Sequence, residues 1–450
     1  MKRVIDTINQ FFTSSYFIGF IGLVTLFSWI YEQEFLGIVL FVLLVSYSFI
    51  TNKNTLPVAG IAIFIPFIFS EHFAIASFSN WLIPTLFLAA IGLTVHIIRF
   101  KPKFKNGRFS LGLVGLVLGF FTMGLFFDGD RHWTLWAVGV VVIFLFAVLY
   151  YFFNNTIEEL NTNYLAKVFF TLGMIIVIQV CIYYYRQPDL MESMRVKSLE
   201  IGWGISNAIA TVLLLTIPIT GYLITTTKKN ILYIIGFTLQ ILTMFFTFSR
   251  GGVLILLLLI IPIIVFITIK SKHLLSLFLK FTLMFFIVLY SFLILMEPLI
   301  EIFEPMITKG FDDSARIALY LEAFQNFKEY PLFGTGLFYK FEVKGKIFWY
   351  HNTILQMASS KGLVGLVAMG IHFFEKYKNT FKKSSTFSIF LLFALFMTDL
   401  HGMIDVTYYA LYYVVPLIFV LILLEKNDQI SSKQNNQANN KIPVSKNDQL

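Results

Sequence analysis

The chain has 450 residues, of which 58% are hydrophobic and only 13% are charged. This composition excludes a soluble globular domain, because such domains carry about 25% charged residues. The formal net charge of +9 does not indicate nucleic-acid binding, since the basic residues are gathered in short loops between apolar runs.

Apolar runs of the length of a membrane span recur along the chain and predict an all-α polytopic membrane protein. A helix that crosses a bilayer needs about 20 mainly apolar residues. We place fourteen such runs, with twelve to fourteen as the range. They cover residues 11–30, 35–50, 57–70, 81–98, 109–127, 134–153, 164–185, 205–225, 231–249, 252–269, 274–296, 352–373, 385–400 and 406–424.

Basic residues predict the orientation of these spans. Short loops that are rich in Lys and Arg stay on the cytoplasmic side of a membrane. With the N-terminus inside, the basic loops fall on one side, which predicts a protein of the cytoplasmic membrane with both termini in the cytoplasm. These loops contain Arg99, Lys101, Lys103, Lys105 and Arg108; Lys228 and Lys229; Lys270 and Lys272; and Lys376, Lys378, Lys382 and Lys383.

The chain divides into three parts. Residues 1–230 are predicted to form N-terminal transmembrane helices, and residues 231–424 are predicted to form the catalytic region. Residues 425–450 are rich in Asn, Gln, Lys and Ser, which predicts a disordered cytoplasmic tail. The longest loop, 297–350, is predicted to lie outside and to contain an amphipathic helix.

That helix is expected to start near Ala315, after Ser314 as its cap, and to end at Tyr330-Pro331. Its apolar residues recur at spacings of three and four, which is typical of one helix face. Such a helix can lie over the membrane surface and cover a cavity. The face consists of Ile317, Tyr320, Leu321, Phe324 and Phe327.

Arg250 is the first candidate site residue. It is followed by Gly251 and Gly252 and stands between two apolar runs. A guanidinium remains charged at biological pH and costs a few kcal/mol or more near lipid, so anion binding is a natural reason to keep one there. The alternative is an arginine that anchors a helix end by extending its charge to water.

Arg316 and His351 lie in and just after the long loop. Together with Arg250, Arg316 can hold a diphosphate through bidentate hydrogen bonds; alternatively, it pairs with Asp312 or Asp313 in a solvated loop. His351 precedes Asn352 at the start of a predicted span and can accept a proton from a sugar hydroxyl. Its alternative is an interfacial histidine in an aromatic belt.

His401 and Asp405 flank the predicted outer turn between the last two spans. An imidazole and a carboxylate this close can orient each other or hold a substrate sugar. Polar capping of two helix ends explains the pair equally well.

We expect neither a metal nor a cofactor. The sequence contains no HExxH, no cysteine cluster and no phosphate-binding glycine-rich loop. Asp128-Gly129-Asp130 has the spacing of a DxD metal motif, although a turn is the simpler interpretation. Lys361 must face the bundle interior or pair with another group, and the sequence assigns it no role.

A set of short motifs in residues 231–424 resembles the superfamily of O-antigen ligases and Wzy-like polysaccharide polymerases. Their order, spacing and predicted location on one side carry the resemblance. The motifs are Ser249-Arg250-Gly251-Gly252, Ala315-Arg316, Tyr330-Pro331-Leu332-Phe333-Gly334-Thr335-Gly336, His351-Asn352-Thr353-Ile354-Leu355, Gly362-Leu363-Val364-Gly365 and the His401 to Asp405 turn.

The resemblance implies transfer of a glycan from an undecaprenyl-diphosphate carrier to an acceptor sugar at the outer face of the membrane. By position, Arg250 and Arg316 would bind the diphosphate, and His351 would activate the acceptor hydroxyl. Asn352, His401 and Asp405 are further candidates for substrate binding. The partners are then the carrier-linked glycan, the acceptor glycan and membrane lipids.

The predicted reaction is polymerisation of repeat units for a capsule, an exopolysaccharide or a related glycan. A flippase and a chain-length regulator are candidate partners of such a polymerase. One alternative is a ligase that attaches a finished glycan to a lipid or protein. The other is a transporter of lipid-linked glycans, but transporters usually place ionisable groups near the bilayer midplane and have repeated halves.

Overall fold

The structure is a computed structural model. It describes residues 2–69, 75–128, 133–158, 161–195, 198–202, 204–308, 314–337, 342–343, 346–347, 349–378, 385–406 and 411–439. The first part of the chain forms α1 (Lys2–Phe12), α2 (Ser15–Ile30), α3 (Glu34–Thr51), α4 (Leu56–Phe64), the 3-10 helix η1 (Ile65–Phe67), α5 (Ile75–Phe100), α6 (Ser110–Thr122), α7 (Trp133–Thr156), α8 (Thr162–Arg186) and α9 (Leu190–Arg195).

The second part forms β1 (Glu200–Ile201), β2 (Gly204–Ile205), α10 (Ser206–Thr226), α11 (Ile231–Phe246), α12 (Arg250–Lys270), α13 (Leu274–Ile294), α14 (Met296–Thr308), α15 (Ser314–Glu329), β3 (Glu342–Val343), β4 (Lys346–Ile347), α16 (Thr353–Tyr377), α17 (Thr386–Gly402) and α18 (Leu411–Asn439). The strands form two antiparallel pairs, with Glu200 opposite Ile205 and Glu342 opposite Ile347.

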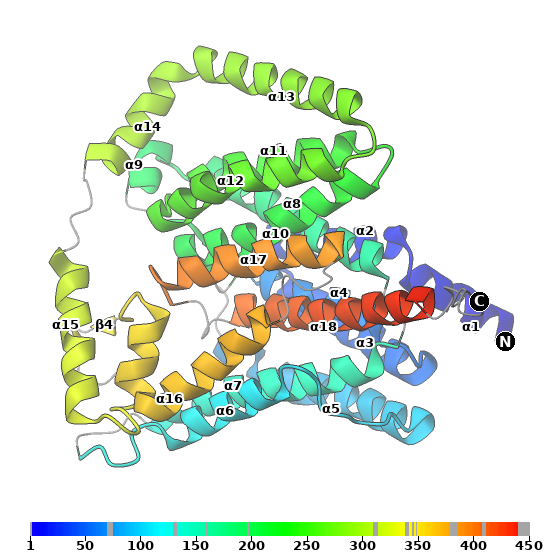
Figure 1. Cartoon of the computed structure of the whole chain (residues 1–450), viewed down its shortest axis with the longest axis vertical. Coiled ribbons are helices and arrows are strands. Elements are labelled where there is room, and N and C mark those ends of the chain that lie inside the picture. The colour runs from blue at the N-terminus through cyan, green and yellow to red at the C-terminus, as the bar shows by residue number, and fades with distance from the viewer. Residues whose placement is uncertain are drawn as a thin grey trace, which may run out of the picture.

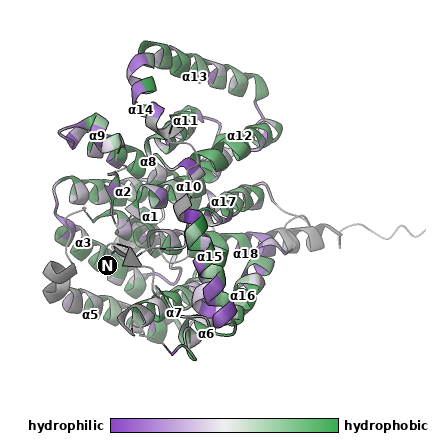
Figure 2. Ribbon diagram, turned by 90° about the vertical axis from the view of Figure 1, so that its left-hand side faces the viewer, coloured by the Kyte–Doolittle hydropathy of each residue, from purple (hydrophilic) through white to green (hydrophobic). Residues whose placement is uncertain are grey.

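Most of the helices run side by side, and α15 lies across one end of them (Figure 1). The end with α9 and α15 is called the α15 end, and the opposite end, where α1 begins and α18 finishes, is called the terminal end. Hydrophobic residues dominate the bundle helices, whereas α9 and α15 contain many hydrophilic ones (Figure 2). This distribution fits an integral membrane protein.

Two helices mark the extremes of packing. α10 packs against α8, α11, α12 and α17. Of the 18 most apolar consecutive residues of α10, 94% are buried. It is apolar on every side, which is typical of a helix at the centre of a bundle. α13 lies at the edge of the bundle, and only 6% of its 18 most apolar consecutive residues are buried.

Each of the fourteen predicted segments overlaps a helix in the described residues, and segment 57–70 overlaps both α4 and η1. Within the described residues, seven helices are long and apolar enough to cross a membrane, or up to eight if α1 and α2, which meet at a 66° bend, form one span. The all-helical membrane class is therefore supported, whereas fourteen complete spans remain a prediction.

The segment between α13 and α16 contains more structure than predicted. Besides α15, whose bounds agree with the expected helix, residues Met296–Thr308 form α14. Three residues of the predicted apolar face of α15, Ile317, Leu321 and Phe324, are exposed, which leaves them free to contact a membrane surface. A different face of the helix, with Leu319 and Ala323, is buried. That face packs on α16 because Asn326 donates hydrogen bonds to the hydroxyls of Tyr350 and Ser359, at 2.8 and 3.3 Å.

α16 is broken at Gly362, which has φ 60° and ψ −151°. A break exposes backbone groups that need partners inside a bundle. Residues 331–336 lie along the break and supply those partners. This segment therefore makes hydrogen bonds with both halves of α16, one on each side of Gly362. The bonds are Thr335 N–H to Ser359 O at 2.9 Å, Gly336 N–H to Ser360 O at 3.0 Å, Leu363 N–H to Pro331 O at 2.7 Å and Val364 N–H to Leu332 O at 3.2 Å.

Replacing Gly362 by alanine is expected to destabilise the protein. This backbone conformation is essentially restricted to glycine, and an added Cβ would lie 2.5 Å from the carbonyl carbon of Leu332. We expect a loss of more than about 2 kcal/mol, measured as a lower midpoint of thermal unfolding in detergent. Gly370→Ala in the same helix is the control, because its Cβ meets nothing within 4 Å; equal midpoints for the two variants would contradict the break.

Lys361, directly before the break, faces the interior as predicted. Its side chain is fully buried, and Nζ donates to Ser360 Oγ at 2.8 Å and lies 4.0 Å from the centre of the Phe120 ring. The ammonium also lies at the carboxyl end of the first half of α16, where a positive charge is favourable. These contacts attach the first half of α16 to α6.

The end of the chain differs from the predicted disordered tail. α18 continues to Asn439, well beyond Glu425. Polar contacts anchor this extension: Glu425 accepts hydrogen bonds from Tyr150 and Asn154, and Asp428 pairs with Arg108 at 3.0 Å. Composition alone missed them because these partners lie in α6 and α7 or just before them. Residues 440–450 lie outside the described residues.

Candidate functional site

The turn after α17 lies between the first residues of α16 and the first residues of α12. On one side, Asn352 Nδ2 donates to Met403 O at 2.8 Å, and Thr353 Oγ1 donates to Asp405 O at 3.2 Å. On the other side, Gly251 is so close to Ile404 that a Cβ would meet its side chain at 3.0 Å. The turn therefore brings the Arg250 end of α12 and the His351 end of α16 together at the α15 end.

His351 and Asp405 form the central pair. The imidazole Nδ1 lies 3.2 Å from Asp405 Oδ1, and 30% of the His351 side chain is exposed. If Nδ1 carries the proton and donates it to the carboxylate, Nε2 is left as an acceptor. This is how a carboxylate orients a histidine that acts as a general base.

Asp405 is held in its ionised form. Burial raises the pKa of this carboxyl, but the hydrogen bond from His351 and the charges of His351 and His401 outweigh burial, so its pKa is lowered below the usual 3.8. The N–H of Val406 also donates to Oδ1, at 2.7 Å. An ionised carboxylate at this position favours the imidazole orientation described above.

Two residues beside the candidate site have a left-handed backbone. His351 has φ 45°, and Phe248, two residues before Arg250, has φ 54°. Such a conformation costs roughly 1–3 kcal/mol per residue and recurs at active sites. Neighbouring contacts hold both in place: Tyr320 donates to His351 O at 3.3 Å, and the Phe248 ring stacks on Phe303 with centres 5.5 Å apart.

Arg250 is the first residue of α12, directly after the cap Ser249, whose Oγ accepts from Gly252 N–H at 3.3 Å. The amino end of a helix carries a partial positive charge, so an arginine in the first turn strengthens a site for an anion. Arg250 also lines a cavity of about 980 Å³ between α11, α12, α13 and α14, whose other lining residues are nearly all apolar.

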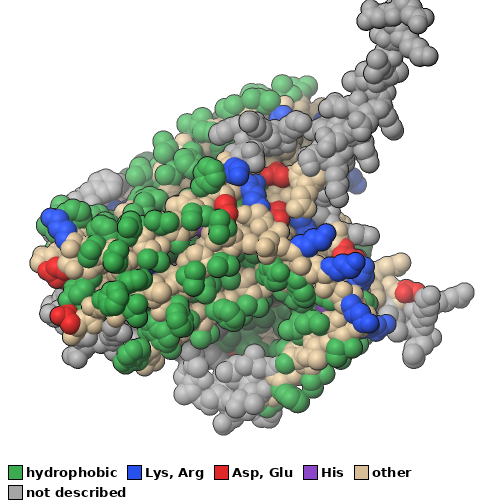
Figure 3. Space-filling model, turned by 60° about the horizontal axis from the view of Figure 1, so that its bottom comes forward, with side chains coloured by type: hydrophobic (Ala, Val, Ile, Leu, Met, Phe, Trp, Pro, Cys, Tyr) green, Lys and Arg blue, Asp and Glu red, His purple; other side chains and the backbone are tan. Residues whose placement is uncertain are grey.

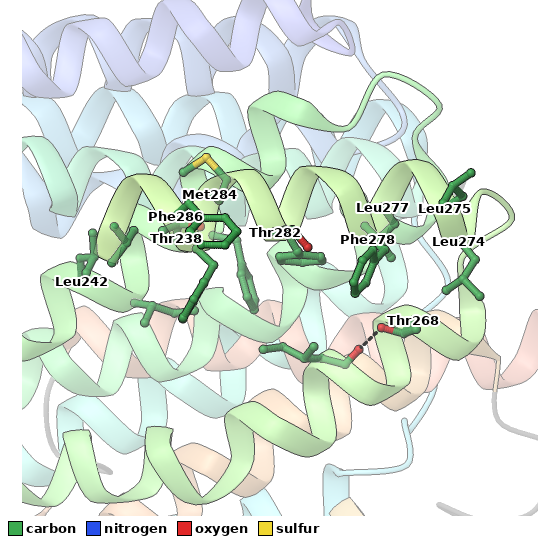
Figure 4. Close-up of a pocket in the computed structure, with 16 residues that line it drawn as sticks. Thr238, Leu242, Thr268, Leu274, Leu275, Leu277, Phe278, Thr282, Met284 and Phe286 are labelled. Atoms are coloured by element: carbon green, nitrogen blue, oxygen red, sulfur yellow. Dashed lines mark hydrogen bonds between the residues drawn. The ribbon is translucent and has the colours of Figure 1, made fainter. Parts of the chain in front are cut away.

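A second cavity of about 890 Å³ continues along α13 toward the terminal end (Figure 4). The two cavities share the lining residues Thr238, Leu242, Met284 and Val288. Together they form one apolar groove, called the α13 groove, with Arg250 near its end at α14. α13 leaves it open because it packs only lightly on the bundle.

Arg316 lies in the first turn of α15 and is half-buried. It is close enough to His401 for its charge to act on that imidazole. Asp312 and Asp313, its alternative partners in the sequence, lie outside the described residues. Both candidate arginines thus occupy the first turn of a helix near the turn after α17.

His401, a predicted substrate-binding residue, contacts other protein groups in this structure, which agrees with the alternative of a polar contact at helix ends. Its side chain is 1% exposed. Nδ1 lies 2.8 Å from Thr211 Oγ1 in α10, and Nε2 lies 3.4 Å from Ser249 Oγ. Because Ser249 caps α12, His401 supports the helix end that carries Arg250. The sequence did not indicate a role for Thr211, because the residues around it are apolar like those of the other predicted spans.

Asn352 is also committed to the protein itself. Its Oδ1 accepts from Leu355 N–H at 3.0 Å, so it caps α16, and its amide nitrogen donates to Met403 as described above. Asn352, directly after His351, thereby attaches the start of α16 to the turn that carries Asp405.

Replacing Thr211 by valine is expected to destabilise the protein by about 1–3 kcal/mol, because a buried His401 nitrogen loses its partner. Thr211→Ser keeps the hydroxyl and should stay near the wild type. Thermal unfolding midpoints of the three proteins measure the difference. If valine and serine behave alike, His401 does not depend on this hydrogen bond.

The described residues contain no group of three His, Cys, Asp or Glu side chains arranged for a metal ion. Asp128, from the DxD-like motif, accepts a hydrogen bond from Tyr330, and its two following residues lie outside the described part. That bond lowers the pKa of Asp128 below its usual value.

Comparison with known families identifies part of the chain. Residues 235–370 match a family model described as O-antigen ligase. The match runs from α11 into α16 and contains Arg250, Arg316 and His351, whereas His401 and Asp405 follow it. No curated protein matches the chain significantly. Over this segment, which is less than a third of the chain, the match supports the resemblance to the superfamily of O-antigen ligases and polymerases that the motifs indicate.

Proposed function

We propose that the protein transfers a glycan from a polyprenyl-diphosphate carrier, undecaprenyl diphosphate by resemblance, to the hydroxyl of an acceptor. The observation that carries the proposal is the turn after α17, which packs against the Arg250 end of α12 and holds His351 through Asp405. An anion site and a general base are thereby neighbours at one end of the bundle, which we propose faces the extracytoplasmic side.

The α13 groove supports the choice of carrier. A polyprenyl diphosphate needs a long apolar surface that ends at a cationic site. The groove supplies the surface along α13, and Arg250 lines the part of it nearest α14. Its open side allows a lipid to enter from the membrane.

The proposed chemistry uses His351 as the base. Nε2 takes the proton of the acceptor hydroxyl while its oxygen attacks the anomeric carbon of the donor sugar. The bond between that carbon and the diphosphate oxygen breaks, and the carrier diphosphate leaves with the electron pair. Arg250 and Arg316 stabilise the charge that develops on it, and Asp405 stabilises the imidazolium.

The acceptor distinguishes two forms of this function. The family description favours ligase-type transfer of a finished glycan to a lipid or protein. Polymerisation of repeat units for a capsule or exopolysaccharide is the second form. It uses the same bond-breaking step with another carrier-linked glycan as the acceptor.

Purified protein in liposomes, supplied with carrier-linked oligosaccharide, tests the proposal. A ladder of longer carrier-linked products identifies a polymerase, and a product that appears only with a separate acceptor identifies a ligase. Movement of the oligosaccharide across the bilayer without any transfer would overturn the proposal in favour of a transporter.

A further inference from the structure

A second apolar groove lies away from the candidate site, between the pair α3 and α5 and the pair α6 and α7. Its volume is about 850 Å³, and its lining includes Ala90 and Ile97 of α5, Val114 of α6 and Val148 of α7. Ile97, Val114 and Val148 are also exposed on the outer surface of the bundle. The groove therefore opens sideways, where lipid chains surround a membrane protein.

The loop between α5 and α6 closes the groove at the terminal end. Phe104 and Asn106 of this loop line the groove. The Phe104 ring stacks on Tyr151, with centres 5.6 Å apart and planes at 14°. Asn155 accepts from Lys105 N–H at 2.9 Å and donates to Lys105 O at 3.0 Å. These contacts fix the loop at the mouth of the groove.

Three lysines of this loop, Lys101, Lys103 and Lys105, are exposed. No described residue provides any of them with an acidic partner. Other basic groups nearby are engaged: Arg108 with Asp428 at 3.0 Å, and Lys53 with Glu158 at 2.7 Å. On the face of the molecule that includes α5, α6 and α7, Lys and Arg side chains gather toward one end of a mostly hydrophobic surface (Figure 3).

We propose that this groove binds an anionic glycerophospholipid, with acyl chains between α5 and α7 and the phosphate at the three lysines. The charge at the mouth selects an anionic headgroup, since basic pockets between membrane helices bind such headgroups. The apolar, laterally open groove accommodates acyl chains. The site is separate from the α13 groove, whose cation stands at the opposite, α15 end, so it is independent of the transfer reaction.

Native mass spectrometry of the full-length protein, with equal amounts of dioleoyl phosphatidylglycerol and dioleoyl phosphatidylcholine, tests the proposal. We expect preferential retention of phosphatidylglycerol. The triple variant Lys101→Gln, Lys103→Gln, Lys105→Gln is expected to lower that retention at least tenfold, since each lysine contributes about fivefold near an anionic surface. The corresponding Lys→Arg triple variant should retain it.

Lys228→Gln, Lys229→Gln, Lys272→Gln is the matched control, because it removes the same charge from other exposed loops. Ala90→Phe fills the groove and should reduce binding of both lipids without changing the charge. Equal retention of the two lipids, or full retention by the Lys→Gln triple variant, would overturn the proposal. A dimer that disappears in Ala90→Phe would assign the groove to a second copy of the chain instead. Unfolding midpoints confirm that every variant is folded.

Discussion

Replacing His351 by alanine is expected to reduce glycan transfer by about 10²–10⁴-fold, the usual contribution of a positioned general base. The imidazole is the group that Asp405 orients, at 3.2 Å. His401, the other histidine near Asp405, is not available to accept the proton of the acceptor hydroxyl, because its ring is buried against Thr211 and Ser249. The rate of transfer at saturating carrier measures the effect, because binding of the carrier should change little.

The variant Asp405→Asn distinguishes the orientation of the His351 ring by residue 405 from the proton transfer that His351 itself performs. An amide oxygen can still accept from Nδ1–H, so the loss should be smaller than for His351→Ala. The pKa of Asp405 is lowered, so its carboxylate is ionised at neutral pH and the substitution removes a full negative charge beside the imidazole. The imidazolium that forms during proton transfer then lacks its anionic partner, so the rate of transfer should fall below that of the wild type. His273→Ala, an exposed histidine before α13, is the control. Normal transfer by His351→Ala would refute the proposed base.

Replacing Arg250 by alanine is expected to weaken productive binding of the carrier thirtyfold or more. Removing one partner of a hydrogen-bonded charge pair costs about 2–5 kcal/mol. Arg250→Lys keeps the charge but loses bidentate geometry, so it should recover only part of the activity. KM for carrier-linked glycan and direct binding of the glycan-free polyprenyl diphosphate measure the effect.

Arg186→Ala is the matched control for Arg250. Arg186 ends α8 at the same end of the bundle, donates to Ile30 O at 2.6 Å and lies over the Trp29 ring. It is not among the residues that line the α13 groove, so carrier binding should be unchanged. If both arginine variants lose binding equally, the effect belongs to that end of the bundle and not to Arg250.

The sequence allowed the helices to be predicted because their signal is local. Runs of apolar residues of sufficient length identify each segment without any knowledge of its neighbours. The same local signals placed α15 between Ser314 and Glu329. They could not say which side of α15 would be buried, since that choice depends on Asn326 meeting Tyr350 and Ser359 in another part of the chain.

The arrangement of the site was less predictable. The pairing of His351 with Asp405 joins residues 54 positions apart, and that of Thr211 with His401 joins residues 190 apart. The sequence singled out His401 for its chemistry but could not tell that its ring would be buried. In the sequence, Pro331 indicated only the end of a helix, and Gly362 was only part of a resemblance. The structure explains residues 331–336 and Gly362 as the two sides of one helix break.

The slight packing of α13 has a practical consequence. Alkyl chains of any solubilising agent have open access to the surface where we place the isoprenoid, and they would compete with it. Kinetic constants obtained in micelles would therefore understate the affinity for the natural donor. Simple long-chain amphiphiles with a phosphate-like head become reasonable starting points for inhibitors.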